Sequence, residues 1–566
     1  MKKLNRYLIL ALFSGAVAMT SCETADLDIT ENPNALVPNQ ANPEFLLASI
    51  QEDFIRHLEG VAATEDNFQT GNDGLFEFGM ELVRTANLNG RNYQSTFQGI
   101  DVDDEWTNVY RGILADIKAM EPLAQEADLT HHIGIAQFIE AYTMSSMVDF
   151  FGDIPYSEFG RLEEGIQNPV ADPGASIYDA ALVLLDEAIT NFKSIPAADP
   201  INDLYYGNDY GQWERAANTL KLKLYLQRRL VDENAMANFN AIIASGNYIQ
   251  DTADDFQFNW PATSATNPDN RHPRYGINYA VAGAGDYMSN WLMNLMNTTN
   301  DPRIRFYFYR QTPTVPGAEI PPDEQLLACS LTTPPPHYVA GGFTFCWLDD
   351  GYWGRDHGNA EGTPPDGLLR TTWGVYPAGG RFDDSSFTAI AQGPASAGAS
   401  GAGISPILTA FMVDFWRAEM ALVTGDIGAA QNHLVNGVTK QIAKVRSFGA
   451  LDTAADLSVA PTDGEVTSYI NSVNSAFASG TMEDKWNVLG EQFLIGSFGN
   501  GVDPYNFYRR TGFPNTVQPN LEPDPGQFIR SFYYPEVSVN ANSNISQKST
   551  NAEPVFWDTT SGPPAN

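Results

Sequence analysis

The 566-residue chain is poor in cysteine, in basic residues and in long hydrophobic runs. Its three cysteines exclude a fold held together mainly by disulfides. Lysine and arginine number 32 against 69 aspartates and glutamates, and the net charge of −37 excludes general affinity for nucleic acid or anionic lipid. Beyond the N-terminus, no stretch reaches the roughly 20 apolar residues that a membrane-spanning helix needs. Aromatic residues make up 12% of the chain, which indicates a large folded core.

The N-terminal residues have the pattern of a secretory signal peptide. Lys2, Lys3 and Arg6 precede an apolar run over 7–19 that is too short to span a bilayer. The run ends in Met19-Thr20-Ser21-Cys22, which resembles the lipobox of bacterial lipoproteins except at Met19, where leucine is usual. We therefore expect residues 1–21 to be removed and Cys22 to be acylated, which would anchor the protein to membrane lipid without spanning it.

An acidic segment follows Cys22. Its carboxylates resemble the export tag that sends Bacteroidetes lipoproteins to the cell surface, and a plain solvated tether explains them equally well; they are Glu23, Asp26, Asp28 and Glu31. We expect residues 22–42 to form a lipidated acidic tether, followed by a single domain over 43–566. Without the signal peptide the chain has 29 basic and 69 acidic residues, a net charge of −40.

Apolar residues recur at spacings of three and four along much of the chain, which predicts amphipathic helices. The predicted helices are 104–127, 131–151, 175–193, 211–230, 234–245, 284–297, 405–424, 426–447, 464–478 and 481–498. Short turns such as Thr424-Gly425-Asp426 join them into pairs, with glycine suited to end one helix and aspartate to begin the next. The expected fold class is mainly α, with tetratricopeptide-like stacked helical pairs, large ordered loop insertions and a few short strands.

Two segments, 250–283 and 299–404, lack helical periodicity and are rich in Gly, Pro, Asn, Asp and aromatic residues. Large aromatic residues are rare in flexible linkers, so we expect ordered loops with short strands that form a ligand-binding face. Cys329 and Cys346 lie 17 positions apart in the second segment. In an exported chain this isolated pair favours one disulfide, and two free buried thiols are the alternative.

Five segments carry motifs in a fixed order: DFFGDIPYSEF at 149–159, YYGNDYGQWERAANTLKLKLYL at 205–226, GRDHGNAEGTPPDGLLRTTWGVYPAGGRFDD at 354–384, RAEMALVTGDIGAAQ at 417–431 and NFYRRTGFP at 506–514. Together with the lipobox they resemble the SusD/RagB family, in its SusD-like branch from Bacteroidetes. The resemblance implies a lipid-anchored, tetratricopeptide-like protein on the cell-surface face of the outer membrane. It implies that the protein binds oligosaccharide or polysaccharide and delivers it to a SusC-like TonB-dependent transporter, without catalysis.

Most of these motif residues also have plain structural interpretations. Gly152 and Pro155 are suited to end a helix and shape a turn. Arg509 and Arg510 are expected to pair with carboxylates or to cap carbonyl groups. Glu419 and Arg417 lie at helical positions where a solvated or an ion-paired face is the ordinary explanation.

Candidate ligand residues are aromatic side chains with polar neighbours. A sugar ring has apolar C–H faces and a rim of hydroxyl groups, so it needs flat aromatic rings beside hydrogen-bonding side chains. The candidates are Trp347, Tyr352, Trp353, Arg355, Asp356 and His357, then Tyr287 and Trp291, and finally Trp373 and Tyr376. Each of these rings fits the protein core equally well, and the sequence does not show which of them face water.

Other chemistry has little support in the sequence. No nucleophile elbow, P-loop or dinucleotide fingerprint occurs, and no motif singles out a pair of carboxylates. His131 and His132 would point about 100° apart on a helix, and the acidic run at 101–105 lacks EF-hand spacing. We expect no catalytic residue, cofactor or metal site. A surface glycan-degrading enzyme and a protein that captures peptides stay open as alternatives.

The charge of the chain bears on the ligand. A net charge of −40 makes strongly anionic polysaccharides less suitable. A local basic patch from Arg271, Arg274, Arg303 or Arg305 would reverse that expectation.

Overall fold

The computed structural model describes residues 41–61, 73–88, 90–264, 269–281, 284–313, 329, 332–360, 369–390 and 397–560. The chain divides into two compact units, Met1–Asn42 and Pro43–Asn566, and the description below concerns the second. The predicted signal peptide, Cys22 and nearly all of the predicted tether lie outside the described residues.

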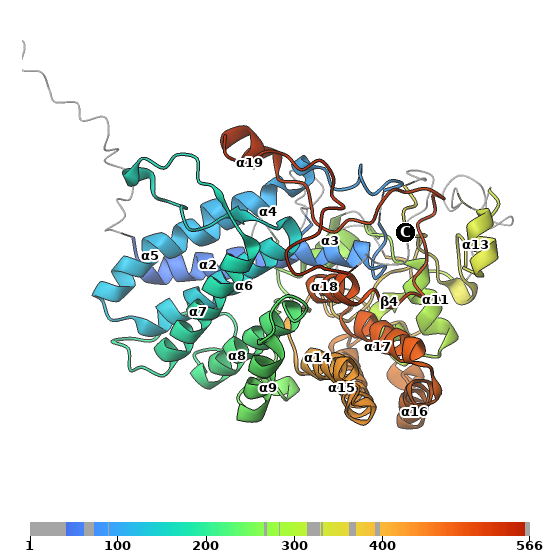
Figure 1. The fold of residues 1–566 in the computed structure, drawn as a ribbon. Coiled ribbons are helices and arrows are strands. Elements are labelled where there is room, and N and C mark those ends of the chain that lie inside the picture. Colours follow the sequence, from blue (N-terminus) through green and yellow to red (C-terminus); the bar gives the residue numbers. More distant parts are fainter. Residues whose placement is uncertain are drawn as a thin grey trace, which may run out of the picture. The chain divides into compact units, whose positions relative to one another are not determined.

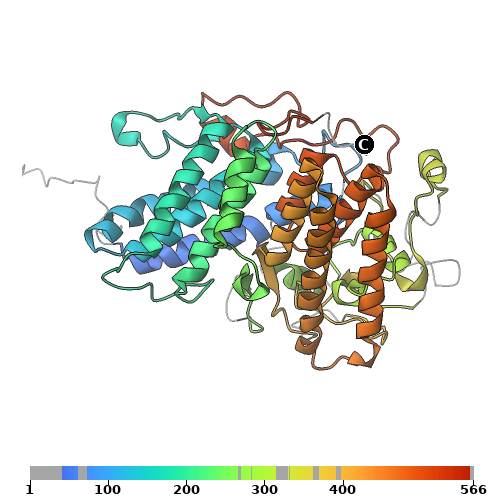
Figure 2. The same cartoon turned by 60° about the horizontal axis from the view of Figure 1, so that its bottom comes forward.

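The first helical group is a row of consecutive helices (Figures 1 and 2). It consists of α2 (Pro43–Glu59), α4 (Asp103–Thr107), the π-turn η3 (Asn108–Ile113), α5 (Leu114–Glu126), α6 (Thr130–Phe151), α7 (Gly174–Phe192), α8 (Tyr210–Gln227) and α9 (Ala235–Ser245). Successive helices from α5 to α9 pack side by side. Nearly every residue of α6 is buried, because α6 is apolar around much of its circumference and lies between its neighbours.

The second helical group contains α14 (Ala410–Thr424), α15 (Ile427–Ser447), α16 (Asp463–Ser479), α17 (Met482–Gly496) and α18 (Val502–Thr511), side by side in Figure 2. The α14–α15 turn follows the sequence prediction, since Gly425 has a left-handed backbone and the Asp426 side chain accepts a hydrogen bond from the Ala429 amide. Thr462 and Thr481 begin α16 and α17 with capping boxes. The predicted mainly α fold of stacked helical pairs is confirmed.

Two predicted helix boundaries are wrong. The segment predicted as helix 405–424 begins as strand β6 (Ile404–Leu408), which pairs antiparallel with β3 (Phe256–Asn259), and its helix starts only at Ala410. A continuous apolar run does not distinguish a buried strand from the first turn of a helix. The segment predicted as helix 284–297 is helical only from Asn290, in α11 (Asn290–Thr298).

Short strands occur in the second loop insertion and after α6. In the insertion, β4 (Phe308–Tyr309) pairs antiparallel with β5 (Thr372–Trp373). After α6, β1 (Ile154–Pro155) pairs antiparallel with β2 (Ala171–Asp172). The other elements are α3 (Leu75–Leu82), η2 (Gly99–Val102), η4 (Leu162–Glu164), η5 (Thr252–Asp254), α10 (Pro273–Tyr275), η6 (Gly276–Val281), α12 (Ile304–Tyr307), α13 (Pro336–Gly341), η8 (Asp349–Gly351), η9 (Phe448–Leu451), η10 (Leu457–Val459) and α19 (Glu536–Ala541). Cys329 and Cys346 form a disulfide, with their Cα atoms 5.6 Å apart.

Asp149 joins four distant segments in the interior. Its carboxylate is 1% exposed and accepts hydrogen bonds from the Tyr178 hydroxyl, from Asn506 Nδ2 at 2.6 Å and from the Trp557 indole at 2.9 Å. Arg509 donates to the Asp149 carbonyl at 2.8 Å and lies over the Trp557 ring. These contacts fix α6 against α7, α18 and the C-terminal segment.

A second buried ion group joins the two helical groups. Arg510 binds both carboxylate oxygens of Glu419, at 2.8 and 2.7 Å, and Arg229 binds the same carboxylate at 2.9 Å. Burial alone would raise the pKa of Glu419, but the two arginines hold it below its ordinary value. The predicted structural roles of Arg509 and Arg510 are therefore confirmed, and of the two alternatives for Glu419 the ion pair is the one that forms.

The acidic run at 101–105 does not gather its carboxylates. Asp101 accepts a hydrogen bond from the Gln98 amide, Asp103 accepts one from the Val537 amide, and Glu105 is buried. Across the described ranges, no cluster of three or more His, Cys, Asp or Glu side chains is arranged to hold a metal ion.

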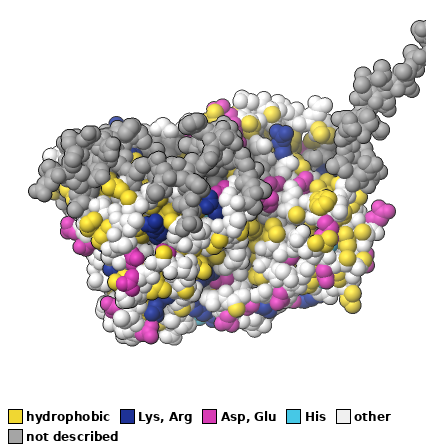
Figure 3. Space-filling model, turned by 180° about the vertical axis from the view of Figure 1, so that it is seen from behind, with side chains coloured by type: hydrophobic (Ala, Val, Ile, Leu, Met, Phe, Trp, Pro, Cys, Tyr) yellow, Lys and Arg dark blue, Asp and Glu magenta, His cyan; other side chains and the backbone are white. Residues whose placement is uncertain are grey.

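Acidic side chains are scattered over one face of the second unit. Figure 3 shows Asp and Glu side chains spread over the face that it presents. None of the helices in the described part of the chain is both long enough and apolar enough to cross a bilayer.

Asp149→Ala is expected to lower the free energy of unfolding by about 3–5 kcal/mol, because three buried donors lose their acceptor. Urea unfolding followed by circular dichroism measures this loss. Asp186→Ala is the matched control, since the Asp186 side chain is 65% exposed, and it should cost about 0–1 kcal/mol. A loss at Asp149 as small as the loss at Asp186 would contradict the role given to Asp149.

Glu105 makes the stability depend on pH. Burial raises the pKa of Glu105 from 4.5 to about 8, so between these values the folded state binds more protons than the unfolded state. The stabilising contribution of this group is complete below pH 4.5 and is lost as the pH rises to about 8. Glu105→Gln should therefore gain stability relative to the unsubstituted protein between pH 5 and pH 8. Urea titrations across that range would refute this if the difference stayed constant.

Candidate functional site

Within the described part of the chain, a groove lies between the second loop insertion and α16. It has a volume of about 890 Å³. One wall comes from the end of α11, the turn into α12 and η8, and the opposite wall from α16 and the 459–461 loop. Its lining includes Asn297, Thr299, Asn300, Asp301, Arg305, Arg310, Asp350, Tyr352, Ser385, Phe387, Glu465, Ser468, Tyr469 and Ser472.

The groove lining contains an arginine that stacks against two aromatic rings. The Arg310 guanidinium lies 4.7 Å from the Tyr352 ring centroid and 5.2 Å from the Phe387 ring centroid. Arg310 Nε donates to Asp383 at 2.6 Å, which fixes the plane of the guanidinium. Burial raises the pKa of Tyr352, so this residue is a neutral ring at physiological pH. The half-buried Phe387 is the most accessible ring of the stack.

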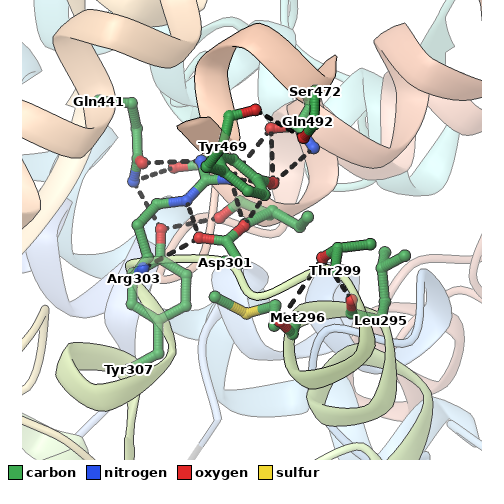
Figure 4. Close-up of polar contacts among 12 residues, drawn as sticks. Leu295, Met296, Thr299, Asp301, Arg303, Tyr307, Gln441, Tyr469, Ser472 and Gln492 are labelled. Atoms are coloured by element: carbon green, nitrogen blue, oxygen red, sulfur yellow. Dashed lines mark hydrogen bonds and ion pairs between the residues drawn. The ribbon is translucent and has the colours of Figure 1, made fainter. Parts of the chain in front are cut away.

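A buried ion pair supports the inner wall (Figure 4). Asp301 accepts from Arg303 Nε at 2.8 Å and from Arg303 Nη2 at 2.5 Å, and it also accepts from the Tyr469 hydroxyl at 2.6 Å. Arg303 donates further to Gln441 on α15 and Gln492 on α17, each at 2.9 Å. One arginine thus fixes the α11–α12 turn against three helices of the second group.

Strained backbone gathers along the groove. Asn300, Asp350, Ser385 and Phe387 have φ values of 53°, 66°, 64° and 52°. Residues other than glycine rarely adopt this left-handed region, and each instance costs about 1 kcal/mol or more. Such strain is common where a loop is held in shape for a ligand.

The exposed edge of the groove is polar. Ser468, Ser472 and Glu465 project from α16, and Thr299 and Asn300 lie across from them. Hydroxyl, amide and carboxylate groups beside an aromatic stack match the hydroxyl rim and apolar face of a sugar ring.

Of the candidate ligand residues, Tyr352 alone lines this groove. Its neighbour Trp353 is 1% exposed and packs with Cys329, Cys346 and the half-buried Trp347 in a small cluster around the disulfide. Trp353 and Trp347 therefore lie in the cluster around the disulfide, whereas Tyr352 lies in the groove lining.

The polar members of the first cluster lie in the interior. Arg355 stacks on Tyr287, with 3.6 Å from the guanidinium carbon to the ring centroid, and Arg370 lies 3.9 Å from the same ring. Asp356 is fully buried and accepts from the Cys346 amide, Asn290 and Gln518. His357 is 2% exposed and bonded to the Tyr93 hydroxyl at 2.9 Å, and burial lowers its pKa well below the ordinary value. In this conformation a ligand has no access to Asp356 or His357.

The remaining candidates are also largely buried. The Trp291 indole donates to the Thr516 carbonyl at 3.1 Å, and the Trp373 indole donates to Asp286 at 2.8 Å. Tyr376 is fully buried and stacks on Tyr307. These rings serve the core, and ligand contact by any of the ten candidates stays a prediction.

Phe387, Arg310 and the α16 serines line the groove but were not predicted from the sequence. These residues come from segments far apart in the chain, and no local motif marks them. The suggested basic patch does not form, because Arg271, Arg274 and Arg303 bind Asp269, Asp73 and Asp301 respectively, and Arg305 alone of the four lines the groove.

Asp301→Asn is expected to lower the free energy of unfolding by about 3–5 kcal/mol, because Arg303 keeps its buried charge without a counterion. Asp350→Asn is the matched control, since Asp350 is exposed, and it should cost about 0–1 kcal/mol. Thermal unfolding of both variants measures the difference. Equal losses would show that the Arg303–Asp301 pair does not support the wall.

Comparisons with known proteins bear on the family. A family model described as "SusD-like, starch-binding associating with outer membrane" matches residues 33–317, half of the chain. No curated protein sequence matches.

Solved structures share the fold. A SusD/RagB family protein from Bacteroides thetaiotaomicron has a TM-score of 0.64 at 17% identity, over 92% of this chain and 100% of its own. A SusD homologue from Bacteroides fragilis has a TM-score of 0.62 at 17% identity, and a chitin-binding SusD homologue from Flavobacterium johnsoniae has 0.60 at 17%. Both comparisons cover 92% of this chain and 99% of the other. The family match over half of the sequence, on this stacked helical fold, places the chain in the SusD/RagB family.

Proposed function

We propose that the protein is a surface lipoprotein that captures an oligosaccharide or polysaccharide and delivers it to a SusC-like TonB-dependent transporter, without catalysis. The observation that carries this proposal is the groove, where an aromatic–arginine stack faces a polar rim in a member of a family described as starch-binding. The chitin-binding homologue from Flavobacterium johnsoniae gives further support for a glycan ligand.

The groove suits binding better than hydrolysis. A glycosidase holds two carboxyl groups across the scissile bond, one as the acid and one as base or nucleophile. Of the groove carboxylates, Asp301 is engaged by Arg303 and Tyr469, whereas Asp350 and Glu465 lie on its exposed edge. Hydrogen bonds from the Thr462 amide and hydroxyl lower the pKa of Glu465, so its carboxylate is ionised and suited to accept hydrogen bonds from sugar hydroxyls rather than to donate a proton.

The anchor and the transporter complete the proposal. Acylation of Cys22, followed by the acidic tether over 22–42, would hold the helical unit at the outer face of the outer membrane. The groove would then collect glycan beside the transporter. Mass spectrometry of the membrane-extracted protein tests the anchor, and co-purification of a TonB-dependent transporter tests the partner.

The soluble protein that begins at Glu23 should be retarded in affinity gels that contain the right neutral polysaccharide, from a panel of starch, β-glucan, mannan and soluble chitin oligosaccharides. Phe387→Ala should weaken retention about tenfold, because it removes the most accessible ring of the stack. The matched control is Phe45→Ala, which removes an aromatic ring that is 75% exposed and lies outside the groove.

A reducing-sugar assay on the same samples separates the alternatives. Retention without new reducing ends supports capture. Retention with release would replace capture by a glycan-degrading enzyme, and no retention by any glycan would contradict glycan capture and favour peptides.

A further inference from the structure

The charge of Arg310 is fully used within the protein. Its Nε donates to Asp383 at 2.6 Å, its Nη1 to the Asp350 carbonyl at 2.6 Å and its Nη2 to Ser385 at 3.2 Å. Aromatic rings contact the guanidinium as well. Arg310 is 7% exposed, so it offers a ligand little beyond the edge of the stack.

Arg305 is the other basic residue of the groove, and it is half engaged. Its Nη1 donates to the Asp383 carbonyl at 2.8 Å and to Ser385 Oγ at 3.0 Å. Against this one cation stand two exposed carboxylates of the lining, Asp350 and Glu465. Glu465 Oε2 also accepts hydrogen bonds from the Thr462 amide and hydroxyl at 2.8 Å each, which fix the carboxylate without neutralising its charge. The local balance of accessible charge in the groove is therefore negative.

Further acidic residues adjoin the groove lining in sequence. Asp349 is exposed beside Asp350, and Asp384 next to Ser385 accepts a hydrogen bond from the Asp456 amide. Asp463 is 92% exposed at the start of α16 and has Arg446 as its cationic partner. An anionic ligand would thus meet carboxylates on both walls of the groove.

We propose that the groove selects neutral glycans and rejects glycans that carry carboxylate or sulfate groups; this inference rests on the proposed function. Hydroxyl groups of a neutral sugar can donate to Asp350 and Glu465 in charge-assisted hydrogen bonds. A uronic acid or sulfate at the same place puts like charges together, which is a common basis for rejecting a ligand. The net charge of the chain adds long-range repulsion in the same direction.

The test compares one neutral polysaccharide with its own charged derivative. The ligand is the neutral polymer retained in the affinity gels, and the probe is the same polymer after oxidation of its primary hydroxyl groups to carboxylates. We expect the oxidised polymer to bind at least about tenfold more weakly at 20 mM NaCl. The gap should narrow at 300 mM NaCl, because salt screens charges at an exposed groove.

A charge-neutralising variant locates the effect. Asp350→Asn/Glu465→Gln should narrow the ratio of neutral to oxidised binding at least about threefold, because it removes the repulsion of the oxidised polymer and also weakens the charge-assisted hydrogen bonds to the neutral one. The matched control is Asp186→Asn/Glu187→Gln, which removes two carboxylates from α7, outside the groove lining. Equal melting temperatures of the two variants check that folding is intact.

The outcomes separate the two proposals. If the oxidised polymer binds as tightly as the neutral one, and Phe387→Ala weakens both, selection is overturned and glycan capture stands. If the oxidised polymer binds weakly but the groove variant narrows the ratio no more than the α7 control, rejection does not come from Asp350 and Glu465, and the inference is overturned. If no neutral glycan binds, the proposed function fails and the inference falls with it.

Discussion

The arrangement of the helices depends on one buried carboxylate, that of Asp149, because both of its oxygens need hydrogen-bond donors. Asp149 cannot remain ionised in the interior without donors, and its donors come from α7, α18 and the C-terminal segment. A buried ion group contributes geometry more than net stability, since a well-packed apolar replacement can be equally stable. Because each donor must reach the same carboxylate, these segments have one mutual arrangement. The groove depends on that arrangement, since α17 packs against α14 and α18, which Glu419 and Asp149 hold in place, and α16 packs against α17.

A second buried ion group, around Arg303, holds the wall of the groove. Arg303 is buried and must be neutralised, so Asp301, Gln441 and Gln492 converge on it from three separate elements. This convergence fixes the α11–α12 turn, and the turn presents Asn300 with its strained backbone. The loop therefore keeps its shape without help from long strands. A preformed groove loses less conformational entropy when it takes up a flexible glycan.

The scaffold was largely predictable from the sequence, and the candidate site largely was not. Helices such as α6 and α15 follow from apolar spacing and from caps like Gly425 and Asp426, which are local signals. The groove joins segments that lie more than 150 residues apart, and no local pattern reports such a meeting. Aromatic density was misleading because Trp353 and its neighbours build a core cluster around the disulfide, whereas Phe387 stands in an unremarkable Asp-Ser-Ser-Phe stretch. Tyr352 is a candidate that lines the groove only because it adjoins that dense cluster.

The scarcity of basic residues explains why buried arginines and an acidic surface occur together. The buried carboxylates of Asp301 and Glu419 need cationic partners. Arg303 pairs with Asp301, and Arg229 and Arg510 pair with Glu419. Arginine suits this role because its planar fork binds two oxygens at once and stays charged when buried. With so few basic residues in the chain, this internal use leaves carboxylates in excess at the surface. The groove surface shares this excess of carboxylates. The pairing of scarce arginines with buried carboxylates therefore stabilises the scaffold and also makes the groove negative where a ligand binds.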